Sequence, residues 1–342
     1  MISRDLRRAI AHAVAAAGFP HVPDPGLRPT GVPGQYAASV ALTLSPNPRE
    51  TAGTLAESLA QEPWIATAVV TGPGYLTITV TPAALAAVAD SIIDAGAACA
   101  TSAALAGQTV PAAPAGDPLT APTWEKARAA LAVRLTARLA AAASATVAEY
   151  PSAERVLASP SVTTDRDSGV ARAVAFAGRD AVLFTLARAI PGKPLRVDQE
   201  IIARHVPANP AYAVRYAHAR AASGLRWAAA SSAAVTPGTE AVPPCPPADS
   251  GELALLDALS WLPERVATAA RRGRPDEFAR YLEDLASVTV DVLSSASHPG
   301  TRGTGRGKEA APGSDRLALP AAARTGLAAG LGLLEVSAPE RL

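Results

Sequence analysis

A stretch of aromatic, basic and small residues at 209–227 carries side chains of the kinds that bind nucleic acid. In a helix with 3.6 residues per turn, one stripe of this stretch collects two phenols, a guanidinium and an indole. These side chains are Tyr212, Tyr216, Arg220 and Trp227. Planar rings stack on bases and guanidinium groups bind phosphate, so the stripe indicates an RNA-binding surface. Aromatic residues at helical spacing are also common in cores, and helix geometry alone favours a buried stripe.

Neighbouring residues indicate how this helix begins and which side it buries. Asn209 can cap the helix through its side-chain oxygen, and Pro210 suits the first turn. The side opposite the stripe is predicted to be core and carries Val214, Ala217, Ala221 and Leu225. His218 lies on the core side, which favours a buried, hydrogen-bonded histidine over a catalytic one. His205 is too isolated in the sequence to be assigned as a ligand.

Charge is unevenly distributed along the chain. The net charge is only +1, but residues 171–226 hold nine lysines or arginines against three acids, a local balance of +6. Such a balance is the electrostatic footprint that attracts an RNA backbone, and Arg215 and Arg226 are predicted to contact phosphates beside the stripe. The alternative is a solvated basic face.

Length and composition favour a helix-rich protein with more than one domain. The chain has 342 residues, of which 49% are hydrophobic and 4% aromatic, and alanine is abundant. Cys99 and Cys245 match no metal spacing, which predicts reduced thiols and a cytoplasmic protein. We expect no membrane span, because no apolar run reaches about 18 residues. No nucleophile, metal or phosphate-loop motif is present, so we predict no catalytic residue, no metal and no cofactor.

The N-terminal part is predicted to be a small α+β domain over residues 1–98. Alternating β-branched residues at 64–70 and 75–80 flank a Gly-Pro-Gly turn, which predicts an antiparallel hairpin. A small-residue apolar segment at 36–44 is predicted to be helical. Further helices are expected at 2–17, 47–61 and 81–98, the second of them capped by Asn47.

The middle of the chain, residues 99–160, reads as a Pro/Ala-rich linker followed by one long helix at 124–150. A leucine stripe on this helix, Leu131, Leu135 and Leu139, needs something to pack on. Either another helix of the chain or a protein partner can cover it. Residues 161–342 are predicted to be helical, with flexible loops at 229–250 and 294–314.

Three segments of the C-terminal half resemble arginyl-tRNA synthetases. Residues 209–220, Asn-Pro-Ala-Tyr-Ala-Val-Arg-Tyr-Ala-His-Ala-Arg, resemble the signature of that family's helical anticodon-binding domain. Residues 184–202 resemble the segment that enters the domain, and 334–342 resemble its C-terminal Ala-Pro-Glu-Arg-Met. Short motifs in the N-terminal part, at 34–36, 47–50 and 72–75, are similar to the family's N-terminal additional domain. The resemblance implies a mainly α fold: a small α+β domain with a short antiparallel sheet, followed by an all-α anticodon-binding bundle that holds the C-terminal tail beside the helix at 209–227.

The sequence also departs from the family. Several hundred residues of nucleotide-binding catalytic domain separate the two domains in a full synthetase, whereas residues 99–160 fill the interval here. Neither a His-Ile-Gly-His-like motif nor a lysine-rich signature loop is present. We therefore expect a protein that is not an enzyme and that binds tRNA, with arginine tRNA as first candidate.

The resemblance and the stripe together predict the RNA contacts. The predicted residues are Tyr36, Asn209, Tyr212, Arg215, Tyr216, Arg220, Arg226, Trp227 and Leu342. A protein-interaction or regulatory module whose partner covers the leucine stripe is the main alternative. An enzyme acting on aminoacylated tRNA is a third, for which the sequence offers no nucleophile or metal constellation.

Overall fold

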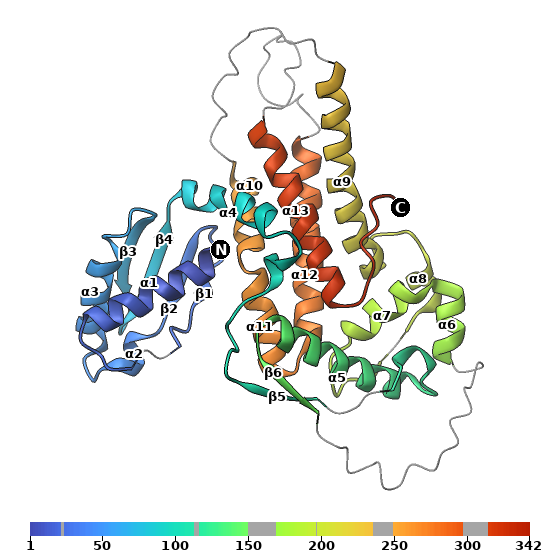
Figure 1. The fold of residues 1–342 in the computed structure, drawn as a ribbon, viewed down its shortest axis with the longest axis horizontal. Helices are drawn as coiled ribbons and strands as arrows, with labels where there is room; N and C mark the ends of the chain where they lie inside the picture. Colours follow the sequence, from blue (N-terminus) through green and yellow to red (C-terminus); the bar gives the residue numbers. More distant parts are fainter. Residues whose placement is uncertain (22–23, 113–115, 150–168, 196, 235–248, 297–313) are drawn as a thin grey trace. The chain divides into compact units, whose positions relative to one another are not determined.

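A computed structural model describes residues 1–21, 24–112, 116–149, 169–195, 197–234, 249–296 and 314–342 (Figure 1). The chain forms two compact units, each described below by itself. The N-terminal unit comprises residues 1–94 and 241–261, and the helical unit comprises 95–240 and 262–342. Parts of the predicted loops at 229–250 and 294–314, together with Cys245 and Arg196, lie outside the described residues.

The N-terminal unit is built on a four-stranded antiparallel sheet with the order β1-β2-β4-β3. The strands are β1 (Arg28–Pro29), β2 (Gln35–Ala38), β3 (Ile65–Thr71) and β4 (Tyr75–Val80). The accompanying helices are α1 (Ile2–Ala16), α2 (Ala41–Leu44), α3 (Pro48–Leu59), α4 (Pro82–Ala95) and α10 (Ser250–Ser260). The predicted hairpin is confirmed. The prediction of helix at 36–44 is wrong in its first half, because Tyr36 pairs with Ile78 of β4 and only residues 41–44 are helical.

Tyr36 lies in the core of this unit. Its side chain is fully buried, its hydroxyl donates a hydrogen bond to the Asp257 carboxylate of α10, and its ring lies 5.7 Å from that of Trp261. Burial raises the pKa of Tyr36, and the neighbouring Asp257 raises it further. The prediction of Tyr36 as an RNA contact is therefore corrected: no part of the ring reaches the surface.

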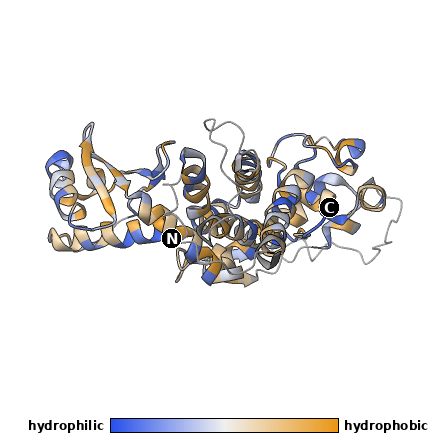
Figure 2. Ribbon diagram, turned by 90° about the horizontal axis from the view of Figure 1, so that it is seen from above, coloured by the Kyte–Doolittle hydropathy of each residue, from blue (hydrophilic) through white to orange (hydrophobic). Residues whose placement is uncertain are grey.

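Among the described residues, the helical unit contains all the remaining helices and one short pair of strands. Its longer helices are α5 (Trp124–Ala142), α9 (Pro210–Ala234), α11 (Leu262–Arg272), α12 (Pro275–Ala296) and α13 (Ser314–Leu333). Its shorter elements are η1 (Gly96–Ala100), η2 (Pro118–Thr120), α6 (Gly169–Ala177), α7 (Arg179–Ala187) and α8 (Gln199–Ala203). α9 packs along α12 and α13, as Figure 1 shows. Hydrophilic and hydrophobic residues alternate around these helices (Figure 2), as expected where one side faces a core. The fold is therefore mainly α, as predicted.

Three element boundaries differ from the sequence-based predictions. α5 ends at Ala142 instead of residue 150, because Ser144 takes a positive φ of 64° and residues 146–149 form strand β6. β6 (Thr146–Glu149) pairs in parallel with β5 (Thr109–Ala112), so the predicted linker contains ordered structure. α9 continues to Ala234, beyond the predicted helix at 209–227 and into the predicted loop at 229–250, because its last turns are mostly alanine.

The leucine stripe of α5 is covered within the helical unit. Leu131, Leu135 and Leu139 are each fully buried, and α5 packs against α7 and α11. The predicted protein partner for this stripe is therefore unsupported, because the surface that such a partner would cover is already part of the core. Cys99 is likewise a buried free thiol of this unit, and burial raises its pKa to about 11.

One helical stretch among the described residues, Pro82–Ala100, has the length and composition that could cross a membrane. It is not an uninterrupted apolar run, because it contains Asp90 and Asp94. Leu85, Val88 and Ile92 of this stretch are buried against the rest of the protein, and Asp90 and Asp94 interrupt its exposed side. Core helices of soluble proteins meet the same criterion, so the stretch is weak support for a membrane span.

Candidate nucleic-acid interface

The start of α9 is fixed by Asn209, as predicted. Its side-chain oxygen accepts hydrogen bonds from the backbone N–H groups of Ala211 at 3.1 Å and Tyr212 at 3.3 Å. Its amide nitrogen donates to the carbonyls of Ile202 at 2.8 Å and Arg204 at 2.9 Å. Asn209 is buried, so its predicted role as an RNA contact is corrected: the side chain positions the helix and the preceding loop.

The two predicted faces of α9 are present in the structure. Val214, Ala217 and Ala221 are fully buried, whereas Tyr216 is 36% exposed and Trp227 is 79% exposed. Tyr212 is half-buried. Tyr216 and Trp227 therefore lie at the surface of the helical unit and not in its core.

Three aromatic rings stack in series at the start of this surface. The rings of Tyr212 and Tyr216 lie 5.7 Å apart between centroids, with 23° between their planes. The ring of His205 lies 5.2 Å from that of Tyr212, with 11° between the planes. We call His205, Tyr212 and Tyr216 the aromatic stack. Sequence reasoning missed His205, because only the Asn209 cap, which folds the loop back onto α9, brings its ring to Tyr212.

The arginines of α9 interact with protein groups. Arg215 lies 3.5 Å from the Asp180 carboxylate, and Arg226 lies 3.7 Å from that of Glu340. Arg220 donates to the Leu293 carbonyl at 3.5 Å. Each of these three arginines also has at least one buried side-chain nitrogen that finds no hydrogen-bond acceptor among the described atoms. The prediction that they are open phosphate contacts is therefore only partly right: they are partly engaged, with donors left over.

The basic footprint is smaller than the sequence count indicates. Five of its nine basic residues form ion pairs: Arg179–Glu335, Arg188–Glu283, Arg204–Glu200, Arg215–Asp180 and Arg226–Glu340. Three of the acids, Glu283, Glu335 and Glu340, lie outside residues 171–226 and were not in the count. Folding thus brings distant carboxylates to this surface and lowers its net positive charge.

The C-terminal tail, residues 337–342, lies against α9 and α13, as predicted. The Nδ1–H group of His218 donates to the Pro339 carbonyl at 2.9 Å. Glu340 pairs with Arg226 and, at 3.1 Å, with Arg324 of α13, while Leu342 is 47% exposed. Burial lowers the pKa of His218, although the Pro339 carbonyl opposes this effect. His218 is therefore the buried, hydrogen-bonded histidine that the sequence predicted.

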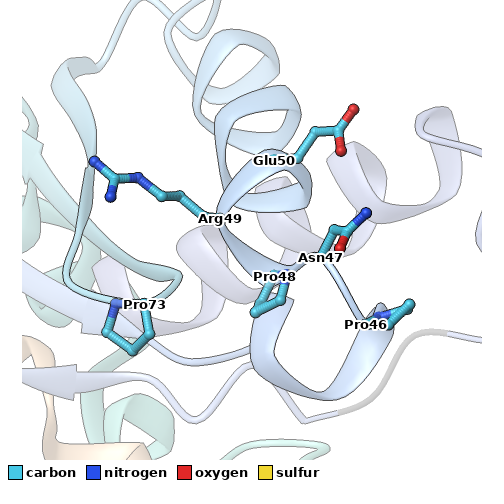
Figure 3. Close-up of a pocket in the computed structure, with 6 residues that line it drawn as sticks. All are labelled: Pro46, Asn47, Pro48, Arg49, Glu50 and Pro73. Carbon is cyan, nitrogen blue, oxygen red and sulfur yellow. The ribbon is translucent and has the colours of Figure 1, made fainter.

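The N-terminal unit has a separate surface hollow of about 560 Å³ where α3 meets the β3–β4 turn (Figure 3). It is lined by Pro46, Asn47, Pro48, Arg49, Glu50 and Pro73. Asn47 makes no side-chain capping bond, contrary to prediction. Arg49 and Glu50 point to different sides in Figure 3 and carry opposite charges, so the hollow offers little net charge for phosphate.

Two family matches lie on the two parts of the chain. The DALR anticodon binding domain matches residues 214–342, and the arginyl tRNA synthetase N terminal domain matches residues 4–80. The DALR match begins within α9, two residues after Tyr212, and covers the rest of that helix and α11 to α13; it also includes residues 241–261 of the N-terminal unit. With both matches in the expected order, the chain is a DALR-type protein related to arginyl-tRNA synthetases.

Individual relatives agree with this assignment. The arginine–tRNA ligase of Bifidobacterium longum (strain NCC 2705) is 35% identical over 194 residues, covering 49% of this chain and 29% of the ligase. The arginine–tRNA ligase of Frankia alni is 37% identical over 171 residues, covering 48% of this chain and 29% of the ligase. The chain thus spans under a third of the length of the curated relatives it matches. The structure of Thermus thermophilus arginyl-tRNA synthetase aligns over 100% of both chains with a TM-score of 0.67 and 15% identity, which shows a shared fold.

Proposed function

We propose that this protein binds tRNA, or an RNA of tRNA-like shape, through the aromatic surface of α9, and that it does not catalyse aminoacylation. The observation that carries the proposal is the stack of half-buried Tyr212 and exposed Tyr216 on α9, at the start of the range that matches a DALR anticodon-binding domain. Stacking contributes about 1–3 kcal/mol per base, and it tolerates any base because every base has a π face. Arginine tRNA is the first candidate, because the relatives are arginine–tRNA ligases.

The arginines of α9 favour the proposal of a ligand that supplies hydrogen-bond acceptors. Buried N–H donors of Arg215, Arg220 and Arg226 have no acceptor among the described residues. A buried donor without a hydrogen bond costs free energy of folding. Phosphate oxygens are strong acceptors for guanidinium groups. A bound RNA backbone would compete with Glu340 for the partly exposed guanidinium of Arg226.

The non-catalytic part of the proposal rests on the interval between the two family matches. The described residues from 96 to 149 form η1, β5, η2, α5 and β6, whose only sheet is a two-stranded parallel pair. A nucleotide-binding domain of crossover helices on a parallel sheet needs several such strands. We expect no arginine to be attached to tRNA when the purified protein is incubated with arginine and ATP. Attachment of arginine to tRNA at a rate typical of a synthetase would contradict the non-catalytic part of the proposal and leave the RNA-binding part untouched.

The RNA-binding part is tested by titrating the full chain into labelled total tRNA and an arginine tRNA transcript over a salt series. We expect micromolar or tighter binding that weakens steeply between about 50 and 200 mM salt, because phosphate contacts release counterions. Tyr216→Ala should weaken binding by about fivefold or more, and Tyr216→Phe, which keeps the ring, should bind like the natural protein. Absence of binding at the lowest salt would overturn the proposal and favour a protein-binding module.

The tail carboxylate gives a further prediction. Glu340→Gln removes the negative charge shared by Arg226 and Arg324, so both guanidinium groups become available to phosphate. We expect tRNA to bind a few-fold more tightly at low salt, and the slope of log affinity against log salt to steepen by about one for each guanidinium that gains a phosphate contact. Glu57→Gln, an exposed carboxylate of α3, is the matched control. An unchanged slope would mean that these arginines do not contact the RNA.

A further inference from the structure

The aromatic stack has a third ring that comes from outside α9. His205 lies between α8 and α9, and its exposed imidazole is nearly parallel to the Tyr212 ring, with 11° between the planes. Tyr212 in turn lies 5.7 Å from Tyr216, which is 36% exposed. His205 and Tyr216 are both exposed, and each of their rings contacts the Tyr212 ring. Each exposed ring can offer a stacking face to a base.

The loop that carries His205 is held on both sides. Asp198 caps α8 by accepting hydrogen bonds from the N–H groups of Glu200 and Ile201, each at 3.1 Å. After α8, the buried amide of Asn209 binds the carbonyls of Ile202 and Arg204, the latter directly before His205. The imidazole is therefore fixed near Tyr212 before any ligand arrives. A platform that is already ordered loses less entropy on binding.

The position of the imidazole indicates a ligand contact. Stacked rings that serve packing are normally buried, whereas the ring of His205 is exposed although its loop is anchored. Histidine is among the side chains on which unpaired RNA bases stack. Its ring nitrogens can in addition donate to, or accept from, the edge of a base.

We propose that His205 stacks a second unpaired base of the RNA that is bound at Tyr212 and Tyr216. The ligand class is a single-stranded RNA segment of at least two nucleotides, such as a tRNA loop. It would extend from Tyr216 on α9 to His205 in the loop after α8. This inference rests on the proposed function. It assigns a base-contacting role to a residue that lies before the range matched by the DALR domain.

The experiment uses the full chain and a short hairpin RNA whose unpaired loop carries the fluorescent base 2-aminopurine at successive positions. Stacking on an aromatic ring quenches this base. We expect His205→Ala to weaken binding about fivefold or more and to abolish the quenching at one loop position while leaving it at another. His205→Phe, which keeps a ring, should retain both affinity and quenching. His12→Ala, an exposed histidine of α1, is the matched control.

The outcomes separate this inference from the proposed function. If the natural protein binds the hairpin and Tyr216→Ala weakens binding, but His205→Ala changes neither affinity nor quenching, His205 is no base contact while RNA binding stands. If His205→Ala and His205→Phe bind the hairpin with equally reduced affinity, the ring has no stacking role and the inference fails. If the natural protein binds no RNA, both the inference and the proposed function fail. Circular dichroism of each variant verifies that α9 is folded.

Discussion

Replacing Leu135 with alanine should lower the free energy of unfolding of the helical unit by about 2–5 kcal/mol. Leu135 is the central residue of the α5 stripe, and its side chain is fully buried. α5 packs on α7 and α11, so truncation leaves a cavity that rigid helices on two sides cannot close completely. Chemical denaturation of the full chain, followed by circular dichroism, measures the change.

The matched control is Arg138→Ala on the exposed side of the same helix, which should change stability by less than about 0.5 kcal/mol. The comparison also decides between two views of α5. If Leu135→Ala were as stable as the natural protein, the stripe would not be core, and a protein partner for it would return as a hypothesis. If it is destabilised, α5 serves the helical unit, in the interval that neither family match covers.

The faces of α9 could be predicted from the sequence because they depend on local geometry. Helical periodicity fixes which residues share a side, and the Asn209 cap fixes where the helix begins. Burial of Val214 and exposure of Trp227 then follow from the pattern. The tail beside α9 was predictable only through resemblance, because nothing in residues 337–342 by themselves indicates where they pack.

What the sequence could not predict depends on contacts between distant residues. Arg226 pairs with Glu340, which is 114 positions away, so a count over a local window overestimates the basic charge. Residues 37 and 38 are alanines, which suit a helix, but pairing with β4 makes them part of a strand, since tertiary contacts override weak propensity. His205 joins the aromatic stack only because a buried amide holds its loop.

Tyr36 is another residue whose position depends on contacts with distant residues, and replacing it should have a large effect on stability. Its motif resembles an RNA-contacting one, yet the fold places the ring against α10, which lies more than 200 positions later. Tyr36→Ala should cost about 3–5 kcal/mol of stability in the N-terminal unit, because a fully buried aromatic side chain is lost. Tyr36→Phe should cost about 1–3 kcal/mol, because the half-buried Asp257 carboxylate then keeps only the Gly34 N–H, at 3.4 Å. Urea denaturation of both variants measures these changes.

The pH dependence of this pair follows from Asp257. Burial raises its pKa above the ordinary value of 3.8, although the hydrogen bonds from Tyr36 and Gly34 lower it in part. A raised pKa means that the folded state holds the proton more tightly than the unfolded state. The resulting stabilisation is fully present below pH 3.8 and is lost as the pH rises through the raised pKa of Asp257. Asp257→Asn, which can still accept from Tyr36, should remove this dependence.

Measuring stability and RNA affinity on the same proteins separates the two roles considered for Tyr36. Tyr36→Phe should lower stability and leave the tRNA affinity of the folded protein unchanged, because the lost hydroxyl faces Asp257 and not solvent. Tyr216→Phe should change neither, and Tyr216→Ala should lower affinity with little effect on stability, because Tyr216 lies at the surface. Weaker tRNA binding by Tyr36→Phe at full stability would contradict the assignment of Tyr36 to the core and restore it as an RNA contact.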